Sequence, residues 1–385
     1  MRILITTGIF EPEAGGPATY TPKIAEKLAG AGWDVTVATY SNKKKFDFDA
    51  DYPFKLVRVL RSGSKLKNYW DFFRTIMRES RRVDLIYSLD SLAAGLPVTI
   101  VALIRRIPVV VRVGGDYLWE RYLESGREPL PLTDFYRHGL QKDYPLFFNL
   151  IGFVLLSARH VIFNSDIQRD LYVLYWGLQA PKTSILHNPA PEKDWLGIRG
   201  ESTEREIVFA GRFNVMKNVI TLVKAFAKAR LPSDYKLTLV GNGPQEGNIR
   251  ALISALHLES RISILGAMHQ KALNQRIKNC RAIVLPSWTD ISPNQVSEAL
   301  ALGIPILVTK ENYLSFHDQL PDMIDPRSVD DIASKLEMLA DEERYEKFAA
   351  DCKAIRLQHD WDDVLGQHLV LFESILNTSI LSKKR

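Results

Sequence analysis

Short apolar runs recur along the first half of the chain, and segments with apolar positions at helical spacing separate them. Continuous apolar strands that alternate with helices are typical of a parallel sheet covered on both faces. We therefore predict strands at residues 2–7, 34–40, 55–60, 84–89, 108–113, 160–165 and 184–188, and helices at 22–32, 69–80, 93–106, 147–159 and 167–177.

The alternation restarts after residues 189–205, a stretch of Pro, Gly and charge that is typical of a linker. Ligands of such sheets bind outside the carboxyl ends of the strands, so we expect the binding loops there, in a cleft between two facing domains. The predicted fold class is α/β, with two doubly wound, Rossmann-like domains. We place the first at 1–190, the second at 191–362, and a helix at about 363–385 back on the first; further strands are predicted at 206–211, 236–241, 261–266, 281–286 and 304–309.

Composition is that of a globular protein. A chain of 385 residues is too long for one hydrophobic core of ordinary size, which suggests two domains. Hydrophobic residues make up 46% of the chain. Two cysteines without metal-type spacing suggest a reducing compartment. No apolar stretch reaches the ~18 residues needed to span a bilayer, and the first run meets Pro12 too early for a signal peptide. We therefore predict a cytoplasmic protein.

Charge is unevenly spread, although the net charge is only +5. Residues 40–82 include the basic stretches NKKKF, RSGSKLK and RESRR. Such a face can meet anionic lipid, nucleic acid or an acidic substrate, or it can simply be solvated. The neighbouring apolar run 146–156 is too short to span a membrane and predicts a buried helix, with membrane docking or contact with an acceptor as the alternative.

Two acids, Asp290 and Glu298, lie eight residues apart in the stretch DISPNQVSEALALGIPIL. Ser292, with Pro293 next and Gln295 three places on, predicts a capping box at the start of a short helix. A free helix amino end attracts anions and can hold a phosphate, so Glu298 could bind ribose hydroxyls and Asp290 a second sugar. Taken alone, the pattern favours the simpler interpretation, that the acids only solvate a loop and a helix.

Two further loops follow predicted strand ends. In FAGRFNVMKNV, Arg212 and Lys217 could meet a diphosphate whose negative charge rises as it leaves, although surface cations at a turn are common. After the first strand, Gly15 and Gly16 allow a close approach of the backbone to a ligand, or they simply form a tight turn. The dinucleotide pattern G-x-G-x-x-G is absent there.

The occurrence of these loops in this order is more specific than any one of them. With LVGNGP and ISILGAM, they resemble the retaining glycosyltransferases of family 4, which have the GT-B fold, over nearly the whole chain. The resemblance implies a UDP- or GDP-sugar as donor and retention of the anomeric configuration. It implies no cofactor, no metal and no nucleic acid, and we expect a glycan or lipid-linked acceptor, with peripheral contact to an anionic membrane at the inner face of the cell membrane.

The resemblance also implies residue roles. Arg212 and Lys217 neutralise the diphosphate, Glu298 binds the ribose, Asp290 lies by the donor sugar in place of the family's first glutamate, and the backbone near 266–268 meets the base. The expected donor-binding residues are Gly15, Gly16, Gly211, Arg212, Lys217, Gly266, Ala267, Met268, Asp290, Ser292, Pro293, Asn294, Gln295, Val296 and Glu298. The expected catalytic residues are Asp116, Arg212, Lys217 and Asp290.

One departure concerns the loop after the strand at 108–113, where many family members carry a histidine. Here the loop reads VGGDYLWE, so Gly114 or Gly115 takes that position and Asp116 follows. Asp116 either orients a sugar hydroxyl or the acceptor, or it caps the helix that begins near Tyr117.

The remaining candidates are weaker. DFDAD at 47–51 resembles a metal-binding D-x-D but lies in a basic loop; His187 is interpreted as structural, and His138 could meet the acceptor. Two other functions remain open at this stage. One is a nucleotide-sugar epimerase of the same fold, and the other is a sugar-binding or sensor protein without chemistry.

Overall fold

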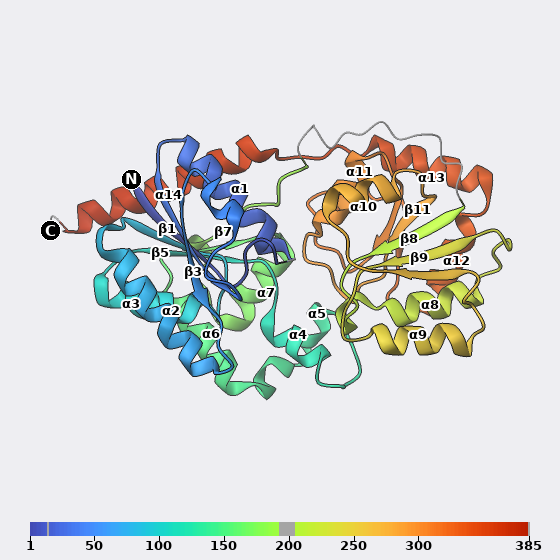
Figure 1. The fold of residues 1–385 in the computed structure, drawn as a ribbon, viewed down its shortest axis with the longest axis horizontal. Coiled ribbons are helices and arrows are strands. Elements are labelled where there is room, and N and C mark those ends of the chain that lie inside the picture. Colours follow the sequence, from blue (N-terminus) through green and yellow to red (C-terminus); the bar gives the residue numbers. More distant parts are fainter. Residues whose placement is uncertain (14, 192–204, 384–385) are drawn as a thin grey trace. The chain divides into compact units, whose positions relative to one another are not determined.

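The computed structural model describes residues 1–13, 15–191 and 205–383 (Figure 1). Contacts between Cα atoms divide the chain into two compact units. The first comprises Met1–Asp116, Leu140–Asn188 and Trp361–Arg385, and the second comprises Tyr117–Gly139 and Pro189–Asp360. Most of the predicted linker lies outside the described residues. The segment Tyr117–Gly139 groups with the second unit, although residues of the first unit precede and follow it in the sequence.

The first unit is built on a seven-stranded sheet in which every pairing is parallel. Its order is β3-β2-β1-β4-β5-β6-β7, so the direction of strand addition reverses between β1 and β4. Ile3 of β1 lies opposite Val35 on one side and Leu85 on the other. The strands are β1 (Arg2–Thr7), β2 (Asp34–Ser41), β3 (Lys55–Leu60), β4 (Leu85–Ser88), β5 (Val109–Val113), β6 (His160–Phe163) and β7 (Thr183–Ile185).

Helices cover both faces of this sheet, as the doubly apolar strands require. Helices α1 (Gly16–Gly30) and α14 (Trp361–Lys383) cover one face, where Ile24 and Phe372 share a core with Ile5. On the other face Phe72 stacks on Tyr40 of β2, with ring centroids 4.4 Å apart. The helices of that side are α2 (Lys65–Glu79), α3 (Gly95–Arg105) and α6 (Pro145–Ser157) (Figure 1), and α7 (Asp166–Trp176) follows β6.

A buried polar cluster fixes α14 to the first sheet. The hydroxyls of Tyr20 and Tyr87 lie 3.2 and 3.1 Å from Nε2 of His368, whose Nδ1 donates to the Val364 carbonyl at 2.7 Å. Burial lowers the pKa of His368 to about 3, so the imidazole is neutral at physiological pH. The cluster therefore stabilises the unit without burying a second charge beside the Arg112 guanidinium, which lies 4.6 Å from the Tyr20 ring.

The second unit repeats the architecture with a six-stranded parallel sheet in the order β10-β9-β8-β11-β12-β13. The direction reverses here between β8 and β11. The predicted α/β class, with two Rossmann-like parallel sheets, is therefore confirmed. The strands are β8 (Glu206–Ala210), β9 (Lys236–Val240), β10 (Ile262–Leu265), β11 (Ala282–Leu285), β12 (Ile306–Thr309) and β13 (Met323–Ile324).

One core holds this unit together. Leu222 and Phe226 of α8 pack with Ile283 of β11 and with Leu336 of α12. Side-chain caps begin two of its helices, because the Ser328 hydroxyl accepts from the Asp331 amide and the Asp341 carboxylate from the Arg344 amide. The helices are α8 (Val219–Lys228), α9 (Glu246–Ala255), α10 (Gln270–Ile277), α11 (Asn294–Ala301), α12 (Val329–Met338) and α13 (Glu342–Ala354).

The segment Tyr117–Gly139 has a small core of its own. It contains α4 (Tyr117–Leu123) and α5 (Leu132–Arg137). The Trp119 indole donates to the Leu130 carbonyl at 2.8 Å, and the rings of Tyr122 and Phe135 lie 5.5 Å apart. Because Trp119 and Phe135 are almost fully buried, the segment is a packed part of the second unit and not an open loop.

Candidate active site

A charged pair lies at the carboxyl edge of the second sheet, where the strand order reverses. Lys217 follows β8 and Asp290 follows β11, the two strands on either side of the reversal. The Lys217 Nζ lies 2.9 Å from both carboxylate oxygens of Asp290, and the Ser287 hydroxyl donates to Asp290 Oδ2 at 2.8 Å. Ligands of open α/β sheets bind at such a reversal. Two residues that sequence analysis assigned separately thus form one group.

Hydrogen bonds hold together the loops that carry Lys217 and Asp290. Asn218, which adopts a left-handed conformation with φ of 56°, donates from its side-chain amide to the carbonyls of Pro286 and Pro326 at 3.1 and 2.9 Å. The Trp288 amide donates to the Met216 carbonyl at 2.9 Å. The side chains of Lys217 and Asp290 therefore project from loops that are braced on both sides of the pair.

Glycines allow the loop after β8 to lie directly on the loop after β9. Gly241 has φ of 145°, and a Cβ there would lie 2.0 Å from the Gly211 carbonyl oxygen. A Cβ on Gly243 would lie 2.4 Å from the Phe213 carbonyl oxygen. The close contact of the two loop backbones thus explains why glycine stands at these positions, including Gly211 with φ of 156°. The same contact fixes the position of Arg212, the residue after Gly211.

Arg212 differs from Lys217 in its surroundings. Its side chain is exposed, and among the described residues no carboxylate forms an ion pair with it. Lys217, by contrast, is only 19% exposed and is already paired with Asp290, itself 9% exposed. The loop after β8 therefore carries one cation that is exposed to solvent and a second that is largely buried and paired.

The predicted capping box at the start of α11 is wrong. Ser292 has φ of 51° and does not cap the helix; Pro293 takes the cap position, which has no side-chain cap bond. The helix begins one residue later than expected, at Asn294. The reason is that Ser292 turns the chain in the left-handed region, which moves its hydroxyl away from the helix end. Gln295 and Val296 lie in the first turn, where Val296 is buried.

Glu298 lies on α11, one helical turn beyond its start. Burial raises the pKa of Glu298 to about 7, and the Gln270 side-chain amide donates to its Oε2 at 3.2 Å, which opposes the shift. A carboxyl with such a pKa is half protonated near neutrality, so it can donate as well as accept a hydrogen bond. Sequence analysis missed Gln270, because the first residue of α10 approaches Glu298 only in the folded sheet.

The loop after β10 supplies the backbone expected to meet a base. Gly266, Ala267 and Met268 are exposed, and α10 begins two residues after Met268. Since β10 is the edge strand beside β9, this loop lies on the same carboxyl edge as the loops after β8 and β9.

The paired glycines after β1 lie in the first unit. Gly15 has φ of 149°, and a Cβ there would lie 2.6 Å from the Ile9 side chain, so only glycine fits. A Cβ on Gly16 would meet nothing within 4 Å, which leaves the start of α1 open beside it. The positive φ and the close Ile9 side chain therefore explain why residue 15 is glycine. At Gly16 the structure leaves space for a ligand.

Asp116 is buried in the first unit, with 1% of its surface exposed. The Tyr172 hydroxyl of α7 donates to Asp116 Oδ2 at 2.9 Å. Next to it, the Gln168 side chain donates to the Gly115 carbonyl at 3.3 Å, and Gly114 faces the Asn164 amide. These bonds position Asp116 firmly at the carboxyl edge of the first sheet.

Asp90 is a further acid that sequence analysis missed. It follows β4, at the reversal of the first sheet, and its Oδ1 accepts from the amides of Leu92 and Ala94 at 2.7 and 3.0 Å. A Cβ on Gly8, after β1, would lie 3.0 Å from Asp90 Oδ2. Burial raises the pKa of Asp90 against these backbone bonds. An acid directly after an apolar strand, SLD in YSLDS, was the available signal.

The segment Tyr117–Gly139 braces the loop that carries Asp290. The Leu132 amide donates to the Thr289 hydroxyl at 2.9 Å, next to Asp290 in the chain. The Asp290 amide donates to the Glu311 carbonyl at 3.0 Å, and the Glu311 side chain accepts from the Thr133 hydroxyl at 3.4 Å. Asp290 is therefore supported from a part of the chain more than a hundred residues away.

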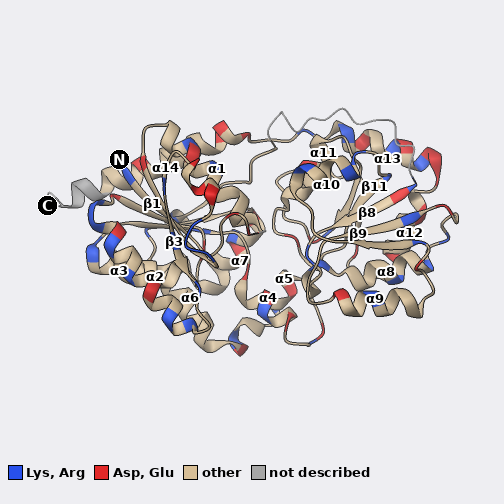
Figure 2. Cartoon of the chain, in the orientation of Figure 1, with Lys and Arg blue, Asp and Glu red and all other residues tan. Residues whose placement is uncertain are grey.

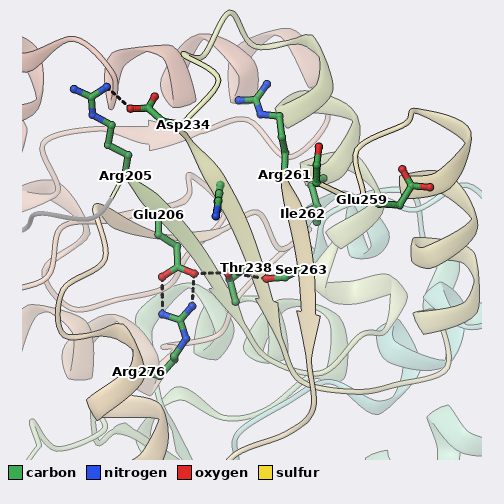
Figure 3. Close-up of a pocket in the computed structure, with 11 residues that line it drawn as sticks. Arg205, Glu206, Asp234, Thr238, Glu259, Arg261, Ile262, Ser263 and Arg276 are labelled. Atoms are coloured by element: carbon green, nitrogen blue, oxygen red, sulfur yellow. Dashed lines mark hydrogen bonds and ion pairs between the residues drawn. The ribbon is translucent and has the colours of Figure 1, made fainter.

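A hollow of about 480 Å³ lies at the opposite edge of the second sheet (Figure 3). Residues near the amino ends of β8, β9 and β10 line it, among them Glu206. The Arg276 guanidinium donates two hydrogen bonds to the Glu206 carboxylate, one of them 2.6 Å long, and the Thr238 hydroxyl donates to the same carboxylate. Because the buried carboxylate is already satisfied and lies at the amino edge, this hollow is separate from the Lys217–Asp290 pair.

Other weak candidates have structural partners. Asp49 of the DFDAD stretch accepts two bonds from Arg58, at 2.9 and 2.7 Å. The His187 Nδ1 lies 3.0 Å from the Asn164 carbonyl oxygen, and His138 is exposed at the end of α5. Over the described ranges, no group of three His, Cys, Asp or Glu side chains is arranged to hold a metal ion.

Comparison with known proteins points to one enzyme class in both halves of the chain. Residues 15–189 match the model of the glycosyltransferase 4-like domain, and residues 195–354 match the model of glycosyltransferases group 1. The structure of HepE from Anabaena with UDP and glucose has a TM-score of 0.76 at 17% identity, over 97% of this chain and 100% of that one.

Curated relatives match over shorter stretches. The N-acetyl-alpha-D-glucosaminyl L-malate synthase of Bacillus anthracis is 32% identical over 108 residues, 28% of each chain. A Campylobacter jejuni 4-alpha-N-acetylgalactosaminyltransferase named for a diphospho-undecaprenol substrate is 26% identical over 42% of this chain and 44% of its own. The matches thus span less than half of these relatives. Each half of the chain thus matches a glycosyltransferase family model, and its two parallel-sheet units have the GT-B fold.

Proposed function

We propose that the protein transfers a sugar from a UDP- or GDP-sugar to an acceptor hydroxyl, with retention of the anomeric configuration. The observation that carries the proposal is the Lys217–Asp290 pair at the strand reversal of the second sheet, with the exposed Arg212 on the same loop. This edge offers a diphosphate one exposed cation, Arg212, and one largely buried cation, Lys217, which is paired with Asp290.

The proposed donor site follows the carboxyl edge of the second sheet. Arg212 binds the diphosphate with its planar fork of donors. Glu298 binds the ribose hydroxyls, and the exposed backbone of Gly266 to Met268 meets the base. The amides at the amino end of α11, which begins at Asn294, donate to a phosphate oxygen.

The proposed chemistry uses the protein's own cations. When the bond between the anomeric carbon and the diphosphate breaks, negative charge grows on the leaving oxygen. Lys217 is 19% exposed and held in place by Asp290, so it can stabilise that charge without first being immobilised. Asp290 orients Lys217 and accepts from a donor-sugar hydroxyl. We propose that transfer needs no metal, because Arg212 and Lys217 together balance the diphosphate.

The proposed acceptor is a glycan or a lipid-linked glycan, which binds to the first unit. The names of curated relatives support this class, because one of them acts on a diphospho-undecaprenol substrate. Asp90 and Asp116, both at the carboxyl edge of the first sheet, are the candidate residues for acceptor or sugar hydroxyls. A lipid-linked acceptor would place the reaction at the inner face of the cell membrane.

The direct test is incubation with a panel of UDP- and GDP-sugars and pools of glycan and lipid-linked acceptors, followed by mass spectrometry. A product heavier than its acceptor by one sugar residue supports the proposal, and nuclear magnetic resonance of the product gives the anomeric configuration. Conversion of one donor into another without acceptor would instead identify an epimerase. Tight donor binding without any product would identify a binding protein.

A further inference from the structure

The two acids of the proposed donor site are held by different kinds of partner. Asp290 is paired with the Lys217 ammonium and also accepts from the Ser287 hydroxyl. In the described structure no lysine or arginine forms an ion pair with Glu298. Instead, the neutral side-chain amide of Gln270 donates to Glu298 Oε2 at 3.2 Å. Glu298 is therefore held by a hydrogen bond and not by a cation.

The charged groups on the elements around Glu298 do not compensate its burial. Glu298 is the only charged residue of α11 (Figure 2), and the neighbouring β12 contains none. Helix α10 carries Lys271, which is exposed, and Arg276, which is bonded to Glu206. Burial thus raises the pKa of Glu298 to about 7, and the Gln270 amide is the group that acts in the opposite direction.

Gln270 is itself fixed in orientation. It is the first residue of α10, and the side-chain oxygen of Asn274, one helical turn further on, accepts from Gln270 Nε2 at 2.9 Å. The same nitrogen faces Glu298, which is the arrangement that an ionised carboxylate requires, because it can only accept. A carboxylate has about four acceptor positions, and Gln270 takes one of them. The others are available to the two vicinal hydroxyls of a ribose.

Gln270 also lies between the segments proposed to hold the two parts of a nucleoside. Met268, the last residue of the exposed backbone proposed to meet the base, precedes it by two residues. Its bond to Glu298 joins α10 to α11, which lie side by side (Figure 1). Because the base and the ribose of a nucleoside are joined at a fixed distance, this bond matches the spacing of the two subsites to one ligand.

We propose that Gln270 is a positioning residue for the donor: its amide, held by Asn274, orients the Glu298 carboxylate toward the ribose hydroxyls and keeps it ionised, so that it accepts from both. The inference rests on the proposed function, because it takes Glu298 as the residue that binds the ribose. It concerns only the donor and does not involve the acceptor or a membrane, which none of the described helices is long and apolar enough to cross. Nucleotide binding should strengthen as pH rises through about 7, where Glu298 loses its proton.

The test is calorimetric titration of the full chain with UDP and with GDP between about pH 6 and pH 8.5. Gln270→Ala removes the donor, so the pKa of Glu298 should rise further and the midpoint of the binding profile should move up by about one pH unit. The affinity should then fall about fivefold at pH 7 and be nearly restored at pH 8.5. Gln270→Lys supplies a charged donor and should move the midpoint to lower pH.

Gln275→Ala is the matched control, because Gln275 is exposed on the same helix. Its profile should coincide with that of the wild type. The phosphate of the nucleotide also titrates near pH 6, but it is the same for every variant and cancels in the comparison. Melting temperatures measured at each pH check that the variants are folded.

Opposite shifts of the midpoint in Gln270→Ala and Gln270→Lys support the inference. A merely structural role of Gln270 would weaken binding by the same factor at every pH. That result, or a Gln270→Ala profile that coincides with the control, overturns the inference and leaves the proposed function in place. If the wild type binds neither nucleotide, the proposed donor is rejected, and the role of Gln270 with it.

Discussion

At the scale of single residues, Lys217 and Asp290 form the group whose role is most open to test. Lys217→Ala should lower kcat by at least about 100-fold and change donor affinity less, because its charge matters most as the diphosphate leaves. The measurement is the initial rate of transfer at saturating donor, with donor binding measured by calorimetry. A chelator should leave wild-type transfer intact, since the proposed site draws its positive charge from the protein.

A control separates this role from a structural one. Lys217→Ala alone leaves the nearly buried Asp290 carboxylate with only the Ser287 hydroxyl, so the protein should also lose stability. The double variant Lys217→Ala/Asp290→Asn removes both charges and should melt closer to the wild type. If that variant also recovers transfer, the lysine is a structural residue and the proposed chemistry is wrong.

The raised pKa of Glu298 predicts that the stability of the protein depends on pH. Burial raises its pKa from 4.5 to about 7, so the folded chain holds a proton that the unfolded chain releases as pH rises through this window. Stability contributed by the protonated form is therefore complete below about pH 4.5 and is lost as pH approaches 7 and above. One pKa unit corresponds to about 1.4 kcal/mol, so the loss is on the order of 2 kcal/mol after allowance for partial exposure.

The variant Glu298→Gln tests this, because glutamine stays neutral. Urea unfolding at pH 5 and pH 8 should show that the variant gains stability relative to the wild type as pH increases. A stability difference that is the same at both pH values would mean that the carboxyl has an ordinary pKa. The variant should also bind UDP or GDP more weakly, by about 1–3 kcal/mol, if the carboxylate holds the ribose.

Sequence analysis found the charged residues of the site but not their arrangement. Strand ends placed Lys217 and Asp290 on one edge, whereas the pairing of their side chains depends on bonds such as that of Asn218 to Pro286. The capping box failed because the same Ser-Pro sequence allows a left-handed serine, and only the surrounding loop selects it. Gln270 was missed because it meets Glu298 only through the fold. Asp90 had a local signal, an acid directly after an apolar strand, that was not used.

At the scale of elements, the segment Tyr117–Gly139 is expected to position Asp290. Thr289→Val keeps the shape of the side chain but removes the hydroxyl that accepts from the buried Leu132 amide. The free energy of unfolding should fall by about 1–3 kcal/mol, because an amide is left without a partner. Transfer should fall as well, with kcat affected more than donor affinity, because Asp290 is the next residue.

The control is Thr183→Val in β7 of the first unit, whose hydroxyl donates to a nearby carbonyl at a partly exposed position. This variant should change neither stability nor transfer appreciably. If Thr289→Val behaves like the control, the segment does not support the catalytic loop. If it lowers stability while kcat stays normal, the segment is a structural brace only.

Element patterns predicted the two sheets well, because several buried strands contain continuous apolar runs such as VIF in β6. The patterns could not show that Tyr117–Gly139 groups with the second unit, since the choice depends on long-range bonds such as Leu132 to Thr289. They also could not separate the buried side of α6 from its exposed side. A continuous apolar run has no period, so it carries no information on which residues face the sheet.

At the scale of the whole molecule, two parallel sheets each reverse their strand order, and the candidate residues lie at the carboxyl edges of both. A hollow lies at the amino edge of the second sheet, where Glu206 and Arg276 already satisfy each other. The central claim is that a nucleoside diphosphate binds at the carboxyl edge, beside Lys217 and Asp290. Nucleotide binding at the carboxyl edge can be compared directly with nucleotide binding at the amino edge of the same sheet.

Hydrogen–deuterium exchange of the full chain with and without UDP or GDP makes that comparison in one measurement. The account predicts slower exchange at residues 211–218, 266–268 and 290–298 with one of the two nucleotides, and unchanged exchange at the amino edge, residues 234–238 and 259–263. Protection confined to the amino edge, or no protection by either nucleotide at millimolar concentration, would contradict it.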